Sequence, residues 1–439
     1  MYIIRPVTIA DANLFGSNVP ETDGTQGEYS AGTTYADGDT VRVTTGGVHK
    51  VYESLQNANT GHAVTDTDWW LDTGATNRWK CFDAKVGTQS TRSESLTHVL
   101  KPGRADSLAL LNLDATEAQI VVSDSSSDLV SNGTAWTGAS GTTQPTGWDK
   151  VGTPSDFTID TGALKITSDA AGEGISQTIA VTAGTEMQLL GKYKNTAGDV
   201  AQYAIYDVTH GADIVAAADL DSSTVDSVFS SVFTVPAGCT SVKISLLAKN
   251  SGDIVWFDSV SLLEVNYNST TDLTSTIAVV DWYTYFFEPI VMATDLVKTD
   301  LATIALPFLD SVVTVTVSNP GGTAKVGELV VGLKFDIGGL HHGAENSMTD
   351  YSTKSTDAFG NFTITTRDYA KNIGGDVEIK NTLRDEVARQ FNAYRTTPLV
   401  WVGHENYTSL IVYGFLSYYK MVWETESHSI YSFEVTGLT

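Results

Sequence analysis

Residues 231–265 read SVFTVPAGCTSVKISLLAKNSGDIVWFDSVSLLEV, and this stretch decides the fold class. Short apolar runs alternate with turns rich in Gly, Asn and Asp, which is typical of short strands at regular spacing. The same texture occurs upstream in DFTIDTGALKITSD (156–169) and GISQTIAVTAGTEMQLLGKYKN (174–195). Together these stretches predict a β-sandwich over this part of the chain.

The rest of the chain also favours strands and turns. There are 38 Gly among 439 residues, and Thr, Ser and Val are abundant. We therefore expect a mainly β, multi-domain protein of β-sandwich and jelly-roll architecture, with one helix near residues 381–395. The helical spacing i, i+4, i+8 and i+11 is carried by Leu383, Val387, Phe391 and Tyr394. Asn381 or Thr382 is expected to cap this helix.

Charge and composition exclude several classes of protein. The net charge is 26 − 52 = −26, which opposes contact with nucleic acid and with anionic membranes. No apolar run of about 18 residues occurs, so we expect no membrane span. The N-terminus lacks the pattern of a signal peptide, because Pro6 interrupts a short apolar stretch. The two cysteines, Cys81 and Cys239, are expected to be buried thiols without a disulfide.

Changes of texture divide the chain into five segments. We expect a framework strand in 1–23, a small module in 24–73, a first framework part in 74–132, an inserted sandwich in 133–265 and a C-terminal framework part in 266–439. The segments before Ser123 and after Tyr267 share one pattern of strand and turn residues, which favours insertion of the sandwich at a surface loop. Deleting about 134–264 is then expected to leave the remainder folded.

The sandwich carries motifs of a known family. Pro-Thr-Gly-Trp (145–148), Ile-Ser-Gln-Thr-Ile (175–179), Phe-Thr-Val-Pro-Ala-Gly (233–238) and Ile-Val-Trp-Phe-Asp (254–258) resemble a family 4/9-type carbohydrate-binding jelly roll. The resemblance implies that Asp258 supports a structural calcium ion, and no other cofactor is expected. Alternatively, Asp258 only forms a hydrogen bond with a neighbouring loop.

The small module resembles a second carbohydrate-binding family. Tyr-Ala-Asp-Gly-Asp-Thr-Val (35–41), Tyr-Glu (52–53), Asn-Thr-Gly (59–61) and Asp-Trp-Trp (68–70) are similar to a chitin-binding type 3 module, a three-stranded mini-domain. This resemblance makes Trp69 and Trp70 candidate sugar contacts. However, family members usually carry exposed aromatics where this chain has Ser-Leu-Gln (54–56). Alternatively, Trp69 and Trp70 build the core of the module together with Tyr35 and Tyr52.

In the jelly roll, a glycan contact should use exposed aromatic side chains with polar neighbours. The candidates are Trp136, Tyr203 and Tyr206, whereas Trp148 is expected in the core. Tyr203 and Tyr206 are three positions apart, so in a regular strand they face opposite sides and only one of them lines a given surface.

The C-terminal part resembles virion proteins. Gly-Glu-Leu-Val-Val-Gly (327–332), Asp-Ala-Phe-Gly-Asn (357–361) and Phe-Glu-Val-Thr-Gly-Leu-Thr (433–439) look like the C-terminal half of tailed-bacteriophage tail proteins. This implies a structural component of a phage tail or tail tip, located in the virion and partnered by other tail proteins and host-surface polysaccharide. An aromatic strand over 282–287 is expected to pack between like subunits in a trimer or hexamer.

A different reading is a secreted glycan-binding protein, or an accessory module of a polysaccharide-degrading system. We expect no enzyme, because no catalytic motif occurs and no carboxylate pair stands out for glycoside hydrolysis. Adjacent His341 and His342 lack the i, i+4 spacing of a metalloprotease helix. Glu424, Glu426 and His428 share a strand face, and a solvated face is the default reading.

Overall fold

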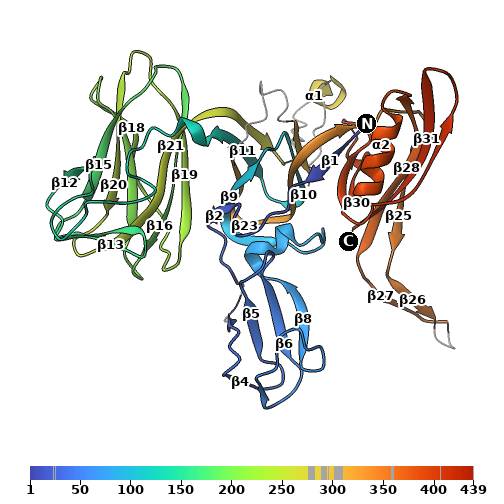
Figure 1. Cartoon of the computed structure of the whole chain (residues 1–439), viewed down its shortest axis with the longest axis horizontal. Coiled ribbons are helices and arrows are strands. Elements are labelled where there is room, and N and C mark those ends of the chain that lie inside the picture. The colour runs from blue at the N-terminus through green and yellow to red at the C-terminus, as the bar shows by residue number, and fades with distance from the viewer. Residues whose placement is uncertain are drawn as a thin grey trace.

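The computed structural model describes the chain except residues 23, 25, 275–281, 288–293, 295, 301–309, 357–359, 406 and 439. Figure 1 shows a central β framework with a jelly roll on one side, a C-terminal unit on the other and a small module projecting away from both. Strands predominate in several sheets, which confirms the expected mainly β, multi-domain fold class. Within the described residues, no helix is long and apolar enough to cross a membrane.

The framework is organised around one long strand. β23 (Ser311–Asp336) pairs antiparallel with β9 (Ser90–Gly103), β10 (Ser107–Asp114), β11 (Glu117–Asp124) and β1 (Tyr2–Pro6). The framework also includes β2 (Leu14–Ser17), η1 (Asn77–Phe82), η2 (Ser125–Ser127) and β22 (Val297–Asp300). Alternate residues of β23, among them Val313, Val315 and Val317, point into a core that also holds Trp79 and Leu100.

The jelly roll consists of two sheets that face each other across one core. The first sheet has the order β12 (Asp149–Val151), β15 (Glu173–Ala180), β20 (Ser241–Ala248), β17 (Ala201–Asp207) and β18 (Ala212–Asp219). The second pairs β13 (Asp156–Asp160), β14 (Ala163–Thr167), β21 (Ile254–Asp272), β16 (Glu186–Asn195) and β19 (Ser227–Thr234). Inward residues such as Phe157, Ile244 and Phe257 are fully buried between them.

The jelly roll and the framework share a strand. The first part of β21 pairs with β14 and β16 inside the sandwich, and its last residues pair with β11 of the framework. A small apolar cluster at this junction joins Leu190, Val228 and Leu263 of the jelly roll to Val99 and Val312 of the framework. The junction is therefore a packed interface as well as a pair of chain crossings.

One buried side chain connects the two bodies by hydrogen bonds. Gln188 of β16 is 0% exposed; its Oε1 accepts from Ser123 Oγ at 2.7 Å, and its Nε2 donates to Thr314 Oγ1 at 2.8 Å. The same Nε2 also donates to Ser230 Oγ of the jelly roll at 2.8 Å. The amide of Gln188 thus fixes the position of the jelly roll relative to the framework.

The small module contains the strands that its sequence resemblance implies. β5 (Thr40–Val43), β6 (Lys50–Ser54) and β8 (Trp70–Ala75) form an antiparallel sheet. β3 (Gly27–Glu28) adds a parallel edge, and β4 (Thr34–Tyr35) pairs with β7 (Asn59–Thr60).

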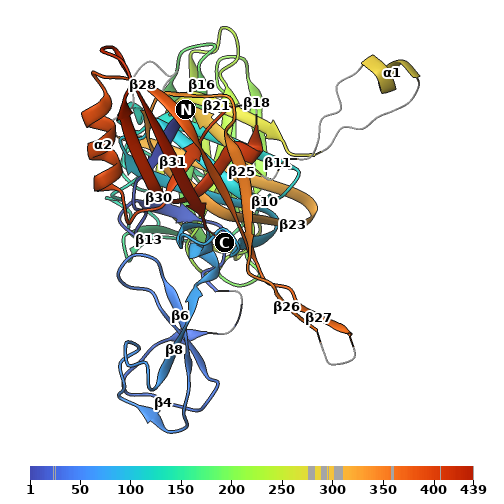
Figure 2. The same ribbon diagram turned by 90° about the vertical axis from the view of Figure 1, so that its right-hand side faces the viewer.

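The C-terminal unit has its own core within the segment that was expected as one framework part. Its sheet contains β24 (Gly339–Leu340), β25 (Glu345–Asp350), β28 (Tyr369–Lys380), β29 (Leu399–Val402), β30 (Ile411–Trp423) and β31 (His428–Gly437). Helix α2 (Arg384–Ala393) lies against one face of this sheet and contributes Val387 and Phe391 to the core (Figure 2). η4 (Thr408–Leu410) precedes β30. A ribbon of β26 (Thr353–Thr356) and β27 (Phe362–Thr365) projects from the unit.

Two local expectations are wrong. The helix near 381–395 exists, but Leu383 stands at its N-cap position without a side-chain cap. Asn381 instead donates to Thr425 O of the neighbouring β30–β31 turn and accepts from Ser429 Oγ of β31, so its side chain is engaged in tertiary contacts and does not cap the helix. The aromatic run 282–287 forms helix α1 (Trp282–Phe287) rather than a strand. A helical turn forms some of its own backbone hydrogen bonds, whereas a strand needs a paired neighbour.

We predict that Gln188→Ala destabilises the junction. Ser123 and Thr314 are both buried and lose a partner, which costs about 1–3 kcal/mol of unfolding free energy for unsatisfied groups. Chemical denaturation of the whole chain measures this loss. Gln202→Ala is the matched control, because Gln202 makes a side-chain bond to Asp219 within one sheet. Equal losses for the two variants would contradict a special role of Gln188 at the junction.

Candidate carbohydrate-binding surfaces

The outer face of the first jelly-roll sheet is the best candidate surface, and we call it the β17–β20 face. Its register places Tyr206 opposite Lys243, Ala204 opposite Ser245 and Gln202 opposite Leu247. On the neighbouring strand β15, Ser176 is opposite Ser245 and Thr178 is opposite Lys243. The residues between them, such as Ile205 and Ile244, point into the core, so this set points outward.

The middle of this face has small side chains. Gly174, Ser176, Ala204 and Ser245 stand on neighbouring strands, and Ser176 and Ser245 are only 6% and 7% exposed. The half-buried Ala204 and Tyr206 are the more accessible part of this face, and hydroxyl groups can donate to and accept from sugar hydroxyls. Tyr206 stands beside them as a half-buried ring with its neighbour Lys243 Nζ at 4.9 Å from the ring centroid.

The two candidate tyrosines lie on opposite sides of the sheet, as expected from their spacing. Tyr203 stacks on Phe229 of the core, with ring centroids 5.4 Å apart and planes at 19°. Tyr206 lies on the β17–β20 face. The inner position of Tyr203 means that Tyr206 is the one available to a ligand on this face.

Polar groups continue the face at its edge. Gln202 Nε2 donates to Asp219 Oδ1 at 2.6 Å, and Lys249 Nζ donates to the other oxygen of Asp219. The hydrogen bond from Lys249 lowers the pKa of Asp219, followed by that from Gln202. Asp219 therefore stays ionised and holds the amide of Gln202 in place. Lys243 carries no signal in the sequence, because only the strand register brings it beside Tyr206, and Gln202 lies four positions from Tyr206 on β17.

The expectation that Trp136 is an exposed contact is wrong. Trp136 is 5% exposed and packs in the jelly-roll core, at 5.5 Å from the ring of Trp148, which is 3% exposed as expected. Trp148 Nε1 donates to Ser131 O at 3.1 Å, which folds residues 131–148 over the end of the sandwich. The polar residues next to Trp136 in the sequence therefore belong to a loop that covers the jelly-roll core, and they do not form an open surface.

We predict that Trp136→Ala destabilises the protein and does not selectively impair a surface. Removal of a buried indole costs about 3–5 kcal/mol of unfolding free energy, because a cavity remains. Thermal unfolding of the full chain should show the loss, and Trp136→Phe should recover part of it. A stability equal to that of the wild type would place Trp136 outside the core.

In the small module, Trp69 and Trp70 have different environments. Trp70 is 2% exposed, packs edge-on against Tyr35 at 5.2 Å and donates its Nε1 to His62 O at 3.0 Å. The alternative reading as core therefore holds for Trp70. Trp69 is half-buried, and one of its faces stacks on His62 with centroids 3.8 Å apart and planes at 10°. A sugar would have to approach Trp69 from its other side.

Asp258 stands on β21 opposite Lys192, and its Oδ2 accepts from Ser259 Oγ at 3.1 Å. Among the described residues, no group of three or more His, Cys, Asp or Glu side chains is placed to hold a metal ion. His341 Nε2 lies 3.5 Å from Glu378 Oε2, and His428 Nδ1 bonds Ser427 Oγ at 2.9 Å. Calcium at Asp258 remains a prediction, because backbone carbonyls also bind calcium.

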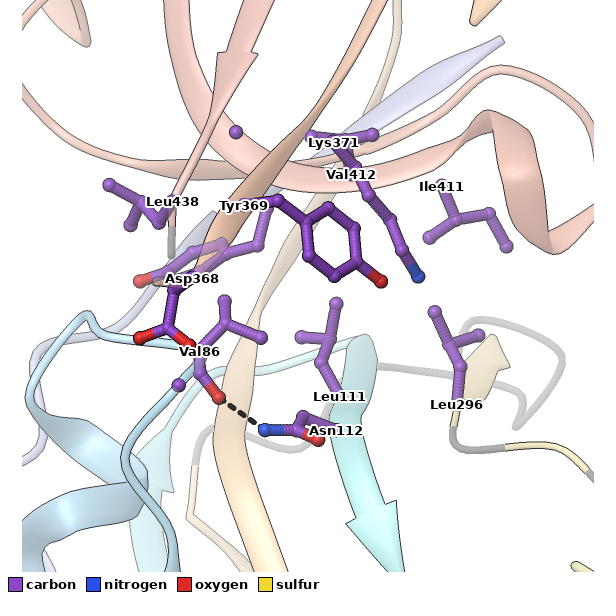
Figure 3. A pocket seen from close by; sticks show the side chains of 13 residues that line it. Val86, Leu111, Asn112, Leu296, Asp368, Tyr369, Lys371, Ile411, Val412 and Leu438 are labelled. Carbon is purple, nitrogen blue, oxygen red and sulfur yellow. Dashed lines mark hydrogen bonds between the residues drawn. The ribbon is translucent and has the colours of Figure 1, made fainter. Parts of the chain in front are cut away.

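A cavity of about 280 Å³ lies between the framework and the C-terminal unit (Figure 3). Its wall combines apolar Leu111, Leu296 and Ile411 with polar Asp368, and Lys371 points into it from β28. Asn112 Nδ2 donates to Val86 O at 2.6 Å, so this amide is engaged with the backbone. The cavity is a gap in the packed seam between the two units.

A buried carboxyl group lies next to this cavity. Glu328 is 3% exposed and accepts a hydrogen bond from Tyr413, a cavity-lining residue, whereas its Oε2 has no partner. Burial raises the pKa of Glu328 well above its usual range, and the nearby charge of Asp83 adds to the rise. The folded protein thus holds a proton on Glu328 at a pH where an unfolded chain would release it.

This shift predicts the pH dependence of stability. The raised pKa of Glu328 stabilises the folded protein. This contribution to the free energy of unfolding is fully present below the ordinary pKa of 4.5 and is lost as the pH rises towards the raised pKa. Glu328→Gln mimics the protonated acid, so its Tm relative to the wild type should increase between about pH 5 and pH 8. Glu345→Gln, on the exposed strand β25, is the control. A difference in Tm that does not change with pH would contradict the assignment.

The cysteines are free and buried, as expected. Cys81 Sγ lies 3.5 Å from His98 Nε2. Burial raises the pKa of the Cys81 thiol and lowers the pKa of His98 to about 3, so both groups are neutral. A reactive thiolate requires the opposite shift.

Solved structures with a similar fold include several carbohydrate-binding modules. One is described as a family 4 module (CBM4), with 17% identity, a TM-score of 0.26, and coverage of 31% of this chain and 99% of that chain. A xylan-binding CBM22-1 domain from Paenibacillus barcinonensis has 15% identity, a TM-score of 0.25, and coverage of 31% and 94%. The enzymatically active domain of bacteriophage CBA120 tailspike protein 4 has 17% identity, a TM-score of 0.24, and coverage of 31% and 21%. No protein-family model matches the chain, and no curated protein sequence matches it.

Proposed function

We propose that this chain is a non-catalytic, glycan-binding structural component of a phage tail or tail tip. The observation that carries the glycan-binding part is the β17–β20 face. There Tyr206 stands next to small and hydroxyl side chains, with Lys243 as its polar neighbour and Gln202 further along β17. Aromatic rings provide a flat face for sugar C–H groups, and the polar neighbours can bond the sugar hydroxyls.

The tail location rests on the motifs of the C-terminal part, and exposed apolar residues support assembly with like subunits. Trp282 and Phe286 of α1 are 77% and 65% exposed, and Phe362 and Ile364 of the projecting ribbon are 75% and 61% exposed. Apolar side chains presented in this way favour burial in a partner. A trimer or hexamer of this chain, next to other tail proteins, would cover them. Gold-labelled antibody against the chain on negatively stained virions tests the location.

A secreted glycan-binding protein, or an accessory module of a polysaccharide-degrading system, is the second candidate. The same β17–β20 face would serve it equally well. It differs in requiring no virion, so labelled antibody would stain culture supernatant and leave tails unlabelled.

We predict that Tyr206→Ala weakens glycan binding by about three- to tenfold, which corresponds to an aromatic contact of roughly 0.5–1.5 kcal/mol. Affinity gel electrophoresis of the full chain against soluble β-glucan, xylan, galactan and glycol chitin measures this. Tyr369→Ala is the matched control, since Tyr369 is 52% exposed on β28, away from the jelly roll. Wild-type protein that binds none of these glycans, or equal losses in both variants, would contradict the proposal.

A further inference from the structure

Lysine side chains and aromatic rings alternate on the outer face of the second jelly-roll sheet. Lys165 of β14, Trp256 of β21 and Lys194 of β16 are direct neighbours across three strands, so their side chains share one face. Lys165 Nζ and Lys194 Nζ lie 6.0 and 5.3 Å from the centroid of the Trp256 ring. This face is on the opposite side of the jelly roll from Tyr206.

The pattern continues onto the framework. Lys192 precedes Lys194 by two positions and lies on the same face, with its Nζ 5.0 Å from the ring centroid of Phe15. Lys101 of β9 approaches the same ring at 4.9 Å. We call this set the lysine–aromatic stripe; it comprises Lys101, Phe15, Lys192, Lys194, Trp256 and Lys165.

The stripe concentrates positive charge in an acidic protein. In the part of the chain that the structure describes, its four lysines form no ion pair, whereas lysines elsewhere do, namely Lys50, Lys249, Lys325 and Lys354. Three carboxylates share the face: Asp258 is opposite Lys192, Asp160 accepts from Trp256 Nε1 at 3.0 Å, and Asp156 lies on β13 with the same parity as Asp160 and accepts from Thr158 Oγ1 at 2.6 Å. Four positive charges therefore meet three negative ones.

We propose that the lysine–aromatic stripe binds an anionic polysaccharide, as a second surface beyond the β17–β20 face. Ammonium groups at strand spacing can contact successive carboxylates or phosphodiesters of an extended chain. The half-buried Trp256 ring offers an apolar contact for sugar C–H groups between them. A nucleic acid fits less well, because a net charge of −26 repels a dense polyanion that extends beyond the stripe.

The test uses the full chain with four substitutions: Lys101→Gln, Lys165→Gln, Lys192→Gln and Lys194→Gln. Binding to polygalacturonate and to teichoic acid is measured by calorimetry, and the two probes distinguish carboxylate from phosphodiester. Carboxyl-reduced polygalacturonate is the neutral probe. Lys325→Gln with Lys354→Gln is the control, because it also removes lysine charge but away from the stripe.

The expected result is a loss of affinity for at least one anionic probe of about tenfold or more in the stripe variant, with little change in the control. Wild-type binding of the anionic probes should weaken as salt increases, and any binding of the neutral probe, through the β17–β20 face, should be the same in the stripe variant. An unchanged Tm would confirm that the variant is folded; if it is not, Lys165→Gln with Lys194→Gln replaces it. Unchanged affinity, an equal loss in the control, or tighter lysine-dependent binding of a single-stranded DNA oligonucleotide would overturn the proposal.

Discussion

The arrangement of this protein depends on one continuous strand. β21 begins inside the jelly roll, between β14 and β16, and ends in the framework against β11. Backbone hydrogen bonds fix the position of neighbouring strands to one register, and a slip of one residue would turn every side chain to the wrong face. Because both bodies pair with the same strand, its backbone connects the two ladders directly, without an intervening loop.

Buried polar groups stabilise the two seams of the molecule in different ways. At the jelly-roll seam, the side-chain amide of Gln188 has donors and acceptors on both sides and leaves no group unsatisfied among Ser123, Ser230 and Thr314. At the C-terminal seam, Glu328 keeps one oxygen without a partner beside a cavity. A satisfied amide specifies one orientation, whereas an incompletely paired acid makes the seam sensitive to protons.

Much of the fold follows from the sequence, since strand periodicity and turn residues are local signals. The sandwich and the helix with Val387 and Phe391 are both predicted correctly. The face of the sheet on which an aromatic side chain lies is harder to predict, because it depends on the register of strands far apart in the chain. Trp136 looks exposed beside polar neighbours, yet the covering loop buries it. Lys243 becomes a neighbour of Tyr206 only through the pairing of β17 with β20.

The shared strand also determines how a mechanical load would pass through the protein. A pull on the jelly roll, directed along β21, would reach the framework through the backbone and stress its hydrogen bonds with β11 and β16 in shear. In shear, many bonds of a ladder resist together, whereas in a peeling geometry they break one after another. A chain that is held at the framework and pulled at the jelly roll would therefore resist extension at its junction, and the looser loops would yield first.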